Sequence, residues 1–262
     1  MGDVVELSEF NCDMVLQMKI SRPQKYNALN EEAYQTIEDC LEDVQKSDDA
    51  RVLVITGASP AFSSGADVDE NFEFDSVKDA RQRVVRHQAQ TVRRIAGLSI
   101  PVLAMVNGPA VGAGMSLAMA CDFIVADKDS YFQAIFPRIG LAADLGLIYH
   151  LVHSLGLYQA RELLFTARRV DASEASELGF INRLAEPDRL EQETEIFVEE
   201  LLKSAPLPLD RMKHLVRRAL HSTYDEFLED EALNQGVLFT TDDLREGKQA
   251  FKEKRHPEFR GS

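Results

Sequence analysis

The hydrophobic pattern of the first two thirds of the chain switches between short apolar runs and longer amphipathic stretches. Residues 15–20 alternate with the period of two that is typical of a strand. Residues 30–45 follow the helical period, with Asn30 as a candidate N-cap. Further strands are predicted at 52–56, 102–106, 123–126 and 131–136, and further helices at 77–98 and 112–119. This βαβα order predicts an α/β fold with parallel strands.

The last third of the chain contains amphipathic helices that follow one another without a strand between them. They are predicted at residues 191–204, 209–222, 224–239 and 242–254. The segment Ala205-Pro-Leu-Pro208 separates the first two, because proline interrupts a helix. We therefore predict a core domain over residues 1–195 and a helical C-terminal region over 196–262, which would serve in trimerisation or as a lid.

Composition narrows the class of protein. A net charge of −15 disfavours general binding to nucleic acid or to anionic membranes. No apolar run approaches the ~20 residues of a membrane span, and the N-terminus lacks a signal-like pattern, so we expect a soluble, cytoplasmic protein. The cysteines Cys12, Cys40 and Cys121 fit neither a disulfide framework nor a zinc motif, so no metal is expected.

Asp144 is the most informative single residue. It lies in Gly140-Leu-Ala-Ala-Asp144-Leu-Gly146, between apolar segments that we expect to be buried. Burial raises the pKa of a carboxylate, and a carboxylate tuned in this way is a candidate general acid/base. Alternatively, Asp144 caps a helix that begins near Leu145.

Two glycine-rich turns follow predicted strands. They are Ala61-Phe-Ser-Ser-Gly-Ala-Asp67 and Asn107-Gly-Pro-Ala-Val-Gly-Ala-Gly114, and the second opens a helix. A helix N-terminus has free N–H groups and a partial positive charge, so one N–H from each turn would form an oxyanion hole. Alternatively, both are tight connections. The second turn lacks the third glycine and the later acid of a dinucleotide-binding fingerprint, so we expect no dinucleotide.

These motifs, in this order, resemble the crotonase (enoyl-CoA hydratase/isomerase) superfamily along nearly the whole chain. Besides the two turns, the matching segments are Ser21-Arg-Pro-Gln-Lys-Tyr-Asn-Ala-Leu29, Ile100-Pro-Val-Leu-Ala-Met-Val-Asn-Gly108, 112–122 and Ala250-Phe-Lys-Glu-Lys-Arg255. The resemblance implies a crotonase-like spiral of ββα units with a C-terminal helical region, assembled as a homotrimer or a dimer of trimers. It implies an acyl-CoA thioester substrate and no cofactor, since CoA is part of the substrate.

The resemblance also implies a substrate site. Its oxyanion hole would consist of the N–H groups of Ala66 and Ala113. Further substrate- and CoA-binding positions would be Lys25, Ala28, Ser64, Asp67, Val68, Gly112, Phe136, Phe251 and Lys254. Phe251 and Lys254 would reach the CoA adenine and phosphate from a neighbouring subunit. The acyl group would lie against residues 69–92.

The acidic residues depart from those of the hydratases in this family. Hydratases carry two glutamates at the positions of Ser116 and Phe136, and neither residue can do that work. A lone Asp144 with Phe136 looks most like the ring-1,2-epoxyphenylacetyl-CoA isomerase type, whose members move double bonds in acyl-CoA esters. We therefore expect an isomerase in which Asp144 removes and returns a proton, Ser116 packs, and Phe136 excludes water.

Other functions stay open at this point. A hydratase-like, hydrolytic or dehalogenating enzyme would use Asp144 as a nucleophile, with help from His87, which by default lies on a solvated helix face. A non-catalytic acyl-CoA or RNA binder would use the basic helix. Its arginines, which we interpret as a solvated face with ion pairs, are Arg81, Arg83, Arg86, Arg93 and Arg94. His150 and His153 lie three residues apart and are interpreted as structural, because no third ligand stands near.

Overall fold

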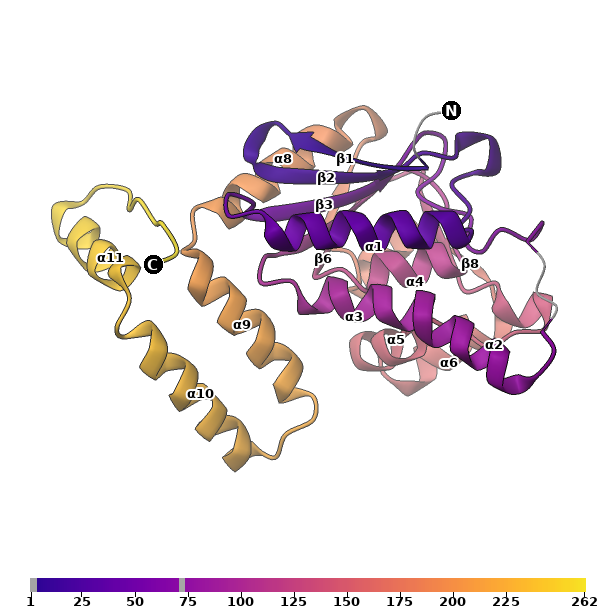
Figure 1. The fold of residues 1–262 in the computed structure, drawn as a ribbon. Helices are drawn as coiled ribbons and strands as arrows, with labels where there is room; N and C mark the ends of the chain where they lie inside the picture. Colours follow the sequence, from indigo (N-terminus) through magenta and orange to yellow (C-terminus); the bar gives the residue numbers. More distant parts are fainter. Residues whose placement is uncertain (1–3, 71–73) are drawn as a thin grey trace.

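The computed structural model describes residues 4–70 and 74–262 (Figure 1). Residues 71–73 of the expected acyl-binding segment therefore lie outside the described residues, as do residues 1–3. The main sheet has six strands in the order β1-β2-β3-β4-β6-β9, and only β1 and β2 pair antiparallel. These strands are β1 (Val5–Phe10), β2 (Cys12–Ile20), β3 (Val52–Gly57), β4 (Val102–Val106), β6 (Phe123–Asp127) and β9 (Arg183–Ala185).

A second, three-stranded sheet has the order β5-β7-β8. It consists of β5 (Ala110–Val111), β7 (Tyr131–Gln133) and β8 (Arg169–Asp171). The helices of the core are α1 (Glu31–Lys46), α2 (Val77–Arg83), α3 (Gln90–Gly97), α4 (Ala113–Met119), α5 (Leu147–Leu155), α6 (Leu157–Thr166), α7 (Ala172–Leu178) and α8 (Leu190–Leu202). A π-helical segment, η2 (Val84–Ala89), joins α2 to α3, and a 3₁₀ turn, η3 (Phe136–Ile139), follows β7.

The two faces of the main sheet explain why its central strands read as continuous apolar runs. Every residue of β3 is buried. Because successive side chains of a strand point to opposite faces, Leu53 and Ile55 join the larger core cluster, together with Ile37 of α1. Val54 faces the other way and packs in a second cluster with Val198 of α8. Helices therefore cover both faces, as the α/β prediction requires.

The predicted elements agree with the structure except at a few places. The predicted strand at 131–136 ends at Gln133, because the chain turns there: Ile135 donates its N–H to the carbonyl of Gln133 at 3.0 Å, and Phe136 begins η3. In the C-terminal third of the chain, the helix predicted at 209–222 begins at Pro206, since proline is tolerated in the first turn of a helix. β1, β5, β8 and β9 were not predicted; the last three have only two or three residues each, too few for a clear alternation.

The C-terminal helices α9 (Pro206–Ala219), α10 (Tyr224–Leu238) and α11 (Asp242–Glu253) project away from the core, with α9 and α10 packed together (Figure 1). Lys213 of α9 ties this region to the core through an ion pair with Asp122, at 2.7 Å. α8 runs unbroken across residue 195 and packs on the sheet. The predicted division at 195/196 falls inside this helix, and it stays a prediction. Among the described residues, no helix has the length and apolar character needed to cross a membrane.

Asn30 caps α1, as the sequence predicts, because its side chain accepts a hydrogen bond from the N–H of Ala33 at 2.9 Å. Asn30→Ala should lower the free energy of unfolding by about 1 kcal/mol. Asn30→Asp should keep the cap and most of the stability. Chemical denaturation of both variants checks this; an Ala variant as stable as the unmodified protein would show that the cap contributes nothing.

Candidate functional site

The first glycine-rich turn runs beside the residues that precede α1. Leu29 donates its N–H to the carbonyl of Gly65 at 2.7 Å, and Asp67 donates its N–H to the carbonyl of Leu29 at 3.0 Å. Leu29 and Ala66 therefore form a parallel bridge. In such a bridge both bonds run through the neighbours of Ala66, so its own N–H points to the opposite side. No acceptor for that N–H is found among residues 4–70 and 74–262.

The second turn places Ala113 at the start of α4, where a helix leaves its first N–H groups without intrahelical partners. Gly65 has a φ of 95°, and a Cβ there would lie 2.7 Å from the carbonyl oxygen of Val111 and 3.2 Å from the nitrogen of Ala113. A Cβ at Gly114 would lie 2.3 Å from the carbonyl oxygen of Ser63. The glycines therefore let the two turns touch, which brings Ala66 and Ala113 onto adjoining segments.

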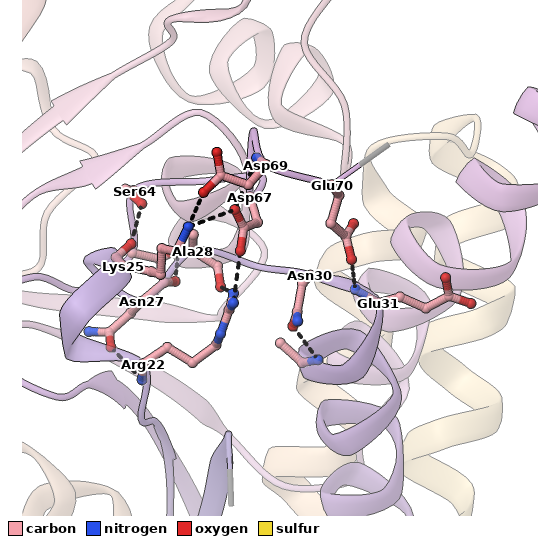
Figure 2. A network of polar contacts seen from close by, with 12 residues as sticks. Arg22, Lys25, Asn27, Ala28, Asn30, Glu31, Ser64, Asp67, Asp69 and Glu70 are labelled. Atoms are coloured by element: carbon pink, nitrogen blue, oxygen red, sulfur yellow. Dashed lines mark hydrogen bonds and ion pairs between the residues drawn. The ribbon is translucent and has the colours of Figure 1, made fainter. Parts of the chain in front are cut away.

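A network around Arg22 holds the first turn against the chain before α1 (Figure 2). The Arg22 guanidinium donates to the carboxylate of Asp67 at 2.7 Å and to the carbonyl oxygen of Ala28. Lys25 forms an ion pair with Asp69, and its ammonium nitrogen lies 3.9 Å from the Asp67 carboxylate. Arg22, Asp67 and Ala28 thus form one hydrogen-bonded unit, together with the neighbouring Lys25, which we call the clamp. Lys25 itself is paired with carboxylates in this structure.

Asn27 fixes the other end of this network. Its side-chain oxygen accepts the N–H of Arg22 at 2.9 Å, and its side-chain NH₂ donates to the carbonyl oxygens of Ala58 and Ala61, both at 2.6 Å. The residue is fully buried and has a φ of 57°, a conformation that asparagine tolerates better than most residues. The sequence analysis gave neither Asn27 nor Arg22 a role, although both belong to the motif from Ser21 to Leu29.

Asp144 does not cap a helix with its side chain. α5 begins at Leu147, its N-cap is Gly146, and no side chain bonds to its first N–H groups. The capping interpretation is therefore wrong. Leu145, which follows Asp144, has a φ of 47°, which is uncommon for a residue other than glycine and costs energy.

The Asp144 carboxylate is desolvated. Its Oδ1 atom is buried and has no hydrogen-bond partner among the described residues. Burial raises the pKa of Asp144 to about 6, against a smaller opposing effect from its own backbone N–H. At neutral pH this carboxylate is mostly ionised, yet it gains a proton more readily than an exposed aspartate. Those are the properties of a group that takes and returns protons.

The two positions that replace hydratase glutamates are both buried. Phe136, the first residue of η3, is only 4% exposed. Ser116 is fully buried, and its hydroxyl donates to the carbonyl oxygen of Gly112 within α4, at 3.2 Å. This bond agrees with the packing role expected for Ser116. Neither Ser116 nor Phe136 has a side chain that titrates near neutral pH.

The remaining predicted site residues are more widely spread. Ser64 lies in the clamp, where its hydroxyl donates to the carbonyl oxygen of Lys25 at 3.1 Å, whereas Val68 is 75% exposed. Phe251 is 86% exposed on α11, and Lys254 ends that helix. Figure 1 shows α11 far from α2 and α4, so within one chain Phe251 and Lys254 are not brought to the other site residues.

His87 is not on a solvated face, which corrects the default interpretation. It is 8% exposed, its ring centre lies 6.3 Å from that of Tyr34, and its Nε2 lies 3.6 Å from Glu31. The basic helix agrees better with expectation, since Arg83 pairs with Glu70 and Arg94 with Glu38.

The histidines of α5 also make contacts. His153 bonds through Nδ1 to the carbonyl oxygen of Tyr149 at 2.8 Å. His150 is half-buried, and burial lowers its pKa. No cluster of three or more His, Cys, Asp or Glu side chains suited to a metal occurs in the described parts of the chain.

Comparison with known proteins identifies relatives of the whole chain. The family model described as enoyl-CoA hydratase/isomerase matches residues 11–262. A crotonyl-CoA hydratase of Syntrophomonas wolfei is 32% identical over 92% of each chain. A 1,2-epoxyphenylacetyl-CoA isomerase of Escherichia coli is 31% identical over 94% of this chain and 95% of its own. The crystal structure of an enoyl-CoA hydratase from Bacillus anthracis has a TM-score of 0.93 at 26% identity, covering 99% of this chain and 100% of that one.

The clamp on Asp67 predicts a pH dependence of stability. Burial alone would raise the pKa of Asp67, but the hydrogen bonds from Arg22 and from the N–H of Asp69 outweigh it and leave the pKa below its usual value. A carboxyl with a depressed folded-state pKa stabilises the fold above its unfolded pKa, ~3.9, and loses that contribution as pH falls through the folded value. Asp67→Asn should therefore destabilise on the order of 1–3 kcal/mol at neutral pH and progressively less below pH ~4.

The matched control for this prediction is Asp69→Asn, because the Asp69 side chain is 71% exposed. It should change stability by less than about 1 kcal/mol at any pH. Denaturation at several pH values measures both variants. An Asp67→Asn deficit that does not shrink in acid would mean that the charge of Asp67 does not contribute.

Proposed function

Because the chain belongs to the enoyl-CoA hydratase/isomerase family, we propose that it is an acyl-CoA isomerase that shifts a double bond in an enoyl-CoA or ring-epoxide/oxepin-type CoA thioester. The family enzymes named above include both a hydratase and an isomerase, so their names leave the reaction open. The observation that carries the choice is the lone, desolvated Asp144 carboxylate, with Ser116 and Phe136 where a hydratase would have its acids.

One carboxylate suffices for a double-bond shift. Asp144 takes a proton from one carbon of the acyl group, and the electron pair of that C–H bond moves toward the thioester carbonyl to form a dienolate. The protonated Asp144 then returns the proton to a different carbon, and the double bond ends in its new position. No water is consumed, and Asp144 ends ionised as it began. Hydration, in contrast, needs one group to activate water and another to deliver a proton.

The negative charge of the dienolate would rest on the thioester oxygen between the N–H groups of Ala66 and Ala113. No acceptor for either N–H is found in the part of the chain that the structure describes, and this observation, with the contact between the two turns, supports the assignment. Fixed backbone donors stabilise such a charge without reorganising during the reaction. Gly112 belongs to the same turn, and Phe136 would exclude water from the reacting carbons.

The CoA part of the substrate would be bound by two subunits. Lys25, Ala28, Ser64, Asp67 and Val68 would supply one side. Phe251 and Lys254 would supply the other from a neighbouring subunit, which the exposed ring of Phe251 supports. Apolar side chains that are exposed on α9 and α10, among them Val216, Leu233 and Val237, give this region the surface that a homotrimer or a dimer of trimers would bury.

Hydration of crotonyl-CoA should be negligible. Neither Ser116 nor Phe136 can activate water or deliver a proton at neutral pH, and the Ser116 hydroxyl is already bonded within α4. The assay follows loss of the conjugated double bond and formation of 3-hydroxybutyryl-CoA. Turnover comparable to the isomerisation rate of a good 3-enoyl-CoA substrate would refute the assignment.

Asp144→Asn should abolish isomerisation and the exchange of substrate α- and γ-protons with solvent, each by roughly 10²–10⁴-fold. For the unmodified enzyme, kcat/KM should rise with pH through an apparent pKa near 6, because only the ionised carboxylate removes a proton. Proton exchange measured by mass spectrometry in D₂O, over a panel of 3-enoyl-CoA esters, tests the loss. Exchange retained in the Asn variant would exclude Asp144 as the base.

The same variant separates a lost base from a lost fold. The pKa of Asp144 is raised by folding, so above pH ~4 its ionised form costs stability, a cost that grows as pH rises toward 6. Asp144→Asn should therefore be as stable as the unmodified protein at neutral pH, or more stable on the order of 1 kcal/mol. Trapping of an aspartyl–acyl adduct at Asp144 would instead favour a nucleophilic hydrolase or dehalogenase.

A further inference from the structure

Tyr34 carries a hydroxyl group that the proposed reaction leaves unused. It lies on α1, which packs against η2 and α3, and it is only 5% exposed. Its ring lies beside His87 of η2, with the ring centres 6.3 Å apart. The Oη atom is buried and has no hydrogen-bond partner in the described chain. Buried hydroxyls nearly always have partners, so this one calls for a physical explanation.

The Tyr34 hydroxyl is near enough to Asp144 to be affected by the charge of its carboxylate. Burial raises the pKa of the phenol, and the charge of Asp144 raises it further, more than any other charge does. The phenol therefore keeps its proton at neutral pH and remains a donor. Because the buried oxygen of Asp144 is also unpartnered, the two groups do not satisfy each other. A third polar atom is needed to satisfy them.

The surrounding side chains do not supply that atom. One turn further along α1, Glu38 accepts a hydrogen bond from Thr91 at 2.6 Å through one oxygen, and its other oxygen lies 2.8 Å from Arg94, so both are engaged. η2 carries another buried acceptor without a partner in the described residues, Gln88 Oε1. Tyr34 of α1 and Gln88 of the adjoining η2 thus each carry a buried polar atom that has no partner among the described residues. Such atoms are typical of a site that recognises a polar group of a ligand.

We propose that Tyr34 donates a hydrogen bond to an oxygen of the acyl group, and that the enzyme acts on acyl-CoA esters carrying a hydroxyl, carbonyl or ether oxygen beyond the carbons that exchange protons. This inference rests on the proposed isomerase function and specifies its substrate class. A buried donor left unpaired by an all-hydrocarbon acyl group penalises that substrate, which is how a polar site rejects an analogue that lacks the oxygen.

The test uses matched pairs of 3-enoyl-CoA esters of equal length, one ending in a hydroxyl or ketone and the other in a methyl group, over a range of chain lengths. The unmodified enzyme should show a kcat/KM at least about tenfold higher for the oxygenated member of the best pair. Tyr34→Phe removes only the hydroxyl. It should abolish the preference and leave turnover of the methyl ester unchanged or faster.

Tyr158→Phe is the matched control, since Tyr158 is 86% exposed, and it should leave the preference intact. Two results would overturn the proposal. If Tyr34→Phe slows both esters equally and shifts the pH profile of kcat/KM, Tyr34 is a positioning residue for Asp144. If the unmodified enzyme has no preference at any length, the phenol only packs.

A binding measurement, which needs no turnover, separates failure of the proposed reaction from failure of the proposed substrate class. Calorimetric binding of the matched saturated acyl-CoA esters should show the same preference for the oxygenated member, again lost in Tyr34→Phe. If no 3-enoyl-CoA is isomerised but this preference is present, the reaction is wrong and the substrate class stands. If isomerisation occurs without the preference in binding or turnover, the substrate class is wrong and the reaction stands.

Discussion

The desolvation of the Asp144 carboxylate is the constraint on which the site depends. The Oδ1 atom of Asp144 is buried without a partner among the described residues, which is unfavourable for an ionised carboxylate, and the fold accepts this cost together with an uncommon φ at Leu145. Strain and unpaired charge of this kind persist only where the surrounding structure holds them in place. Because the Asp144 side chain has no capping role, the proposed acid/base chemistry does not compete with a structural bond to α5.

Whereas Asp144 supplies acceptor oxygens, the two glycine-rich turns of the core supply backbone N–H donors. Two backbone turns approach until a side chain at Gly65 or Gly114 would collide with the neighbouring backbone. Arg22, Asp67 and Asn27 then secure the first turn through side-chain bonds rather than through a longer sheet. The two turns are in contact, and no acceptor for the N–H groups of Ala66 or Ala113 is found among the described residues. In the proposed mechanism the acid/base group and the oxyanion donors come from separate segments, so each can be tested without altering the other.

The sequence predicts the fold class well, because continuous apolar runs such as 52–56 identify strands buried on both faces. The TM-score of 0.93 to a solved enoyl-CoA hydratase confirms the crotonase-like fold. Short elements such as β8 and β9 escape prediction, since their pairing depends on partners distant in sequence. For the site, the motif points to Asp144, but only three-dimensional structure shows that Gly146, and not Asp144, is the N-cap of α5. The structural roles of Arg22 and Asn27 escape prediction because they arise from contacts with Asp67, Ala58 and Ala61, which lie far along the chain.

Titration of Asp144 in the free enzyme tests the central claim most directly, because it depends on no choice of substrate. The protein would be labelled with ¹³C at aspartate carboxyl carbons, and the Asp144 signal assigned by its loss in Asp144→Asn. Its chemical shift, followed as pH is raised, should show a midpoint near 6. A midpoint at the ~3.9 of an exposed aspartate would show that the carboxylate is solvated, and it would contradict this account of the site.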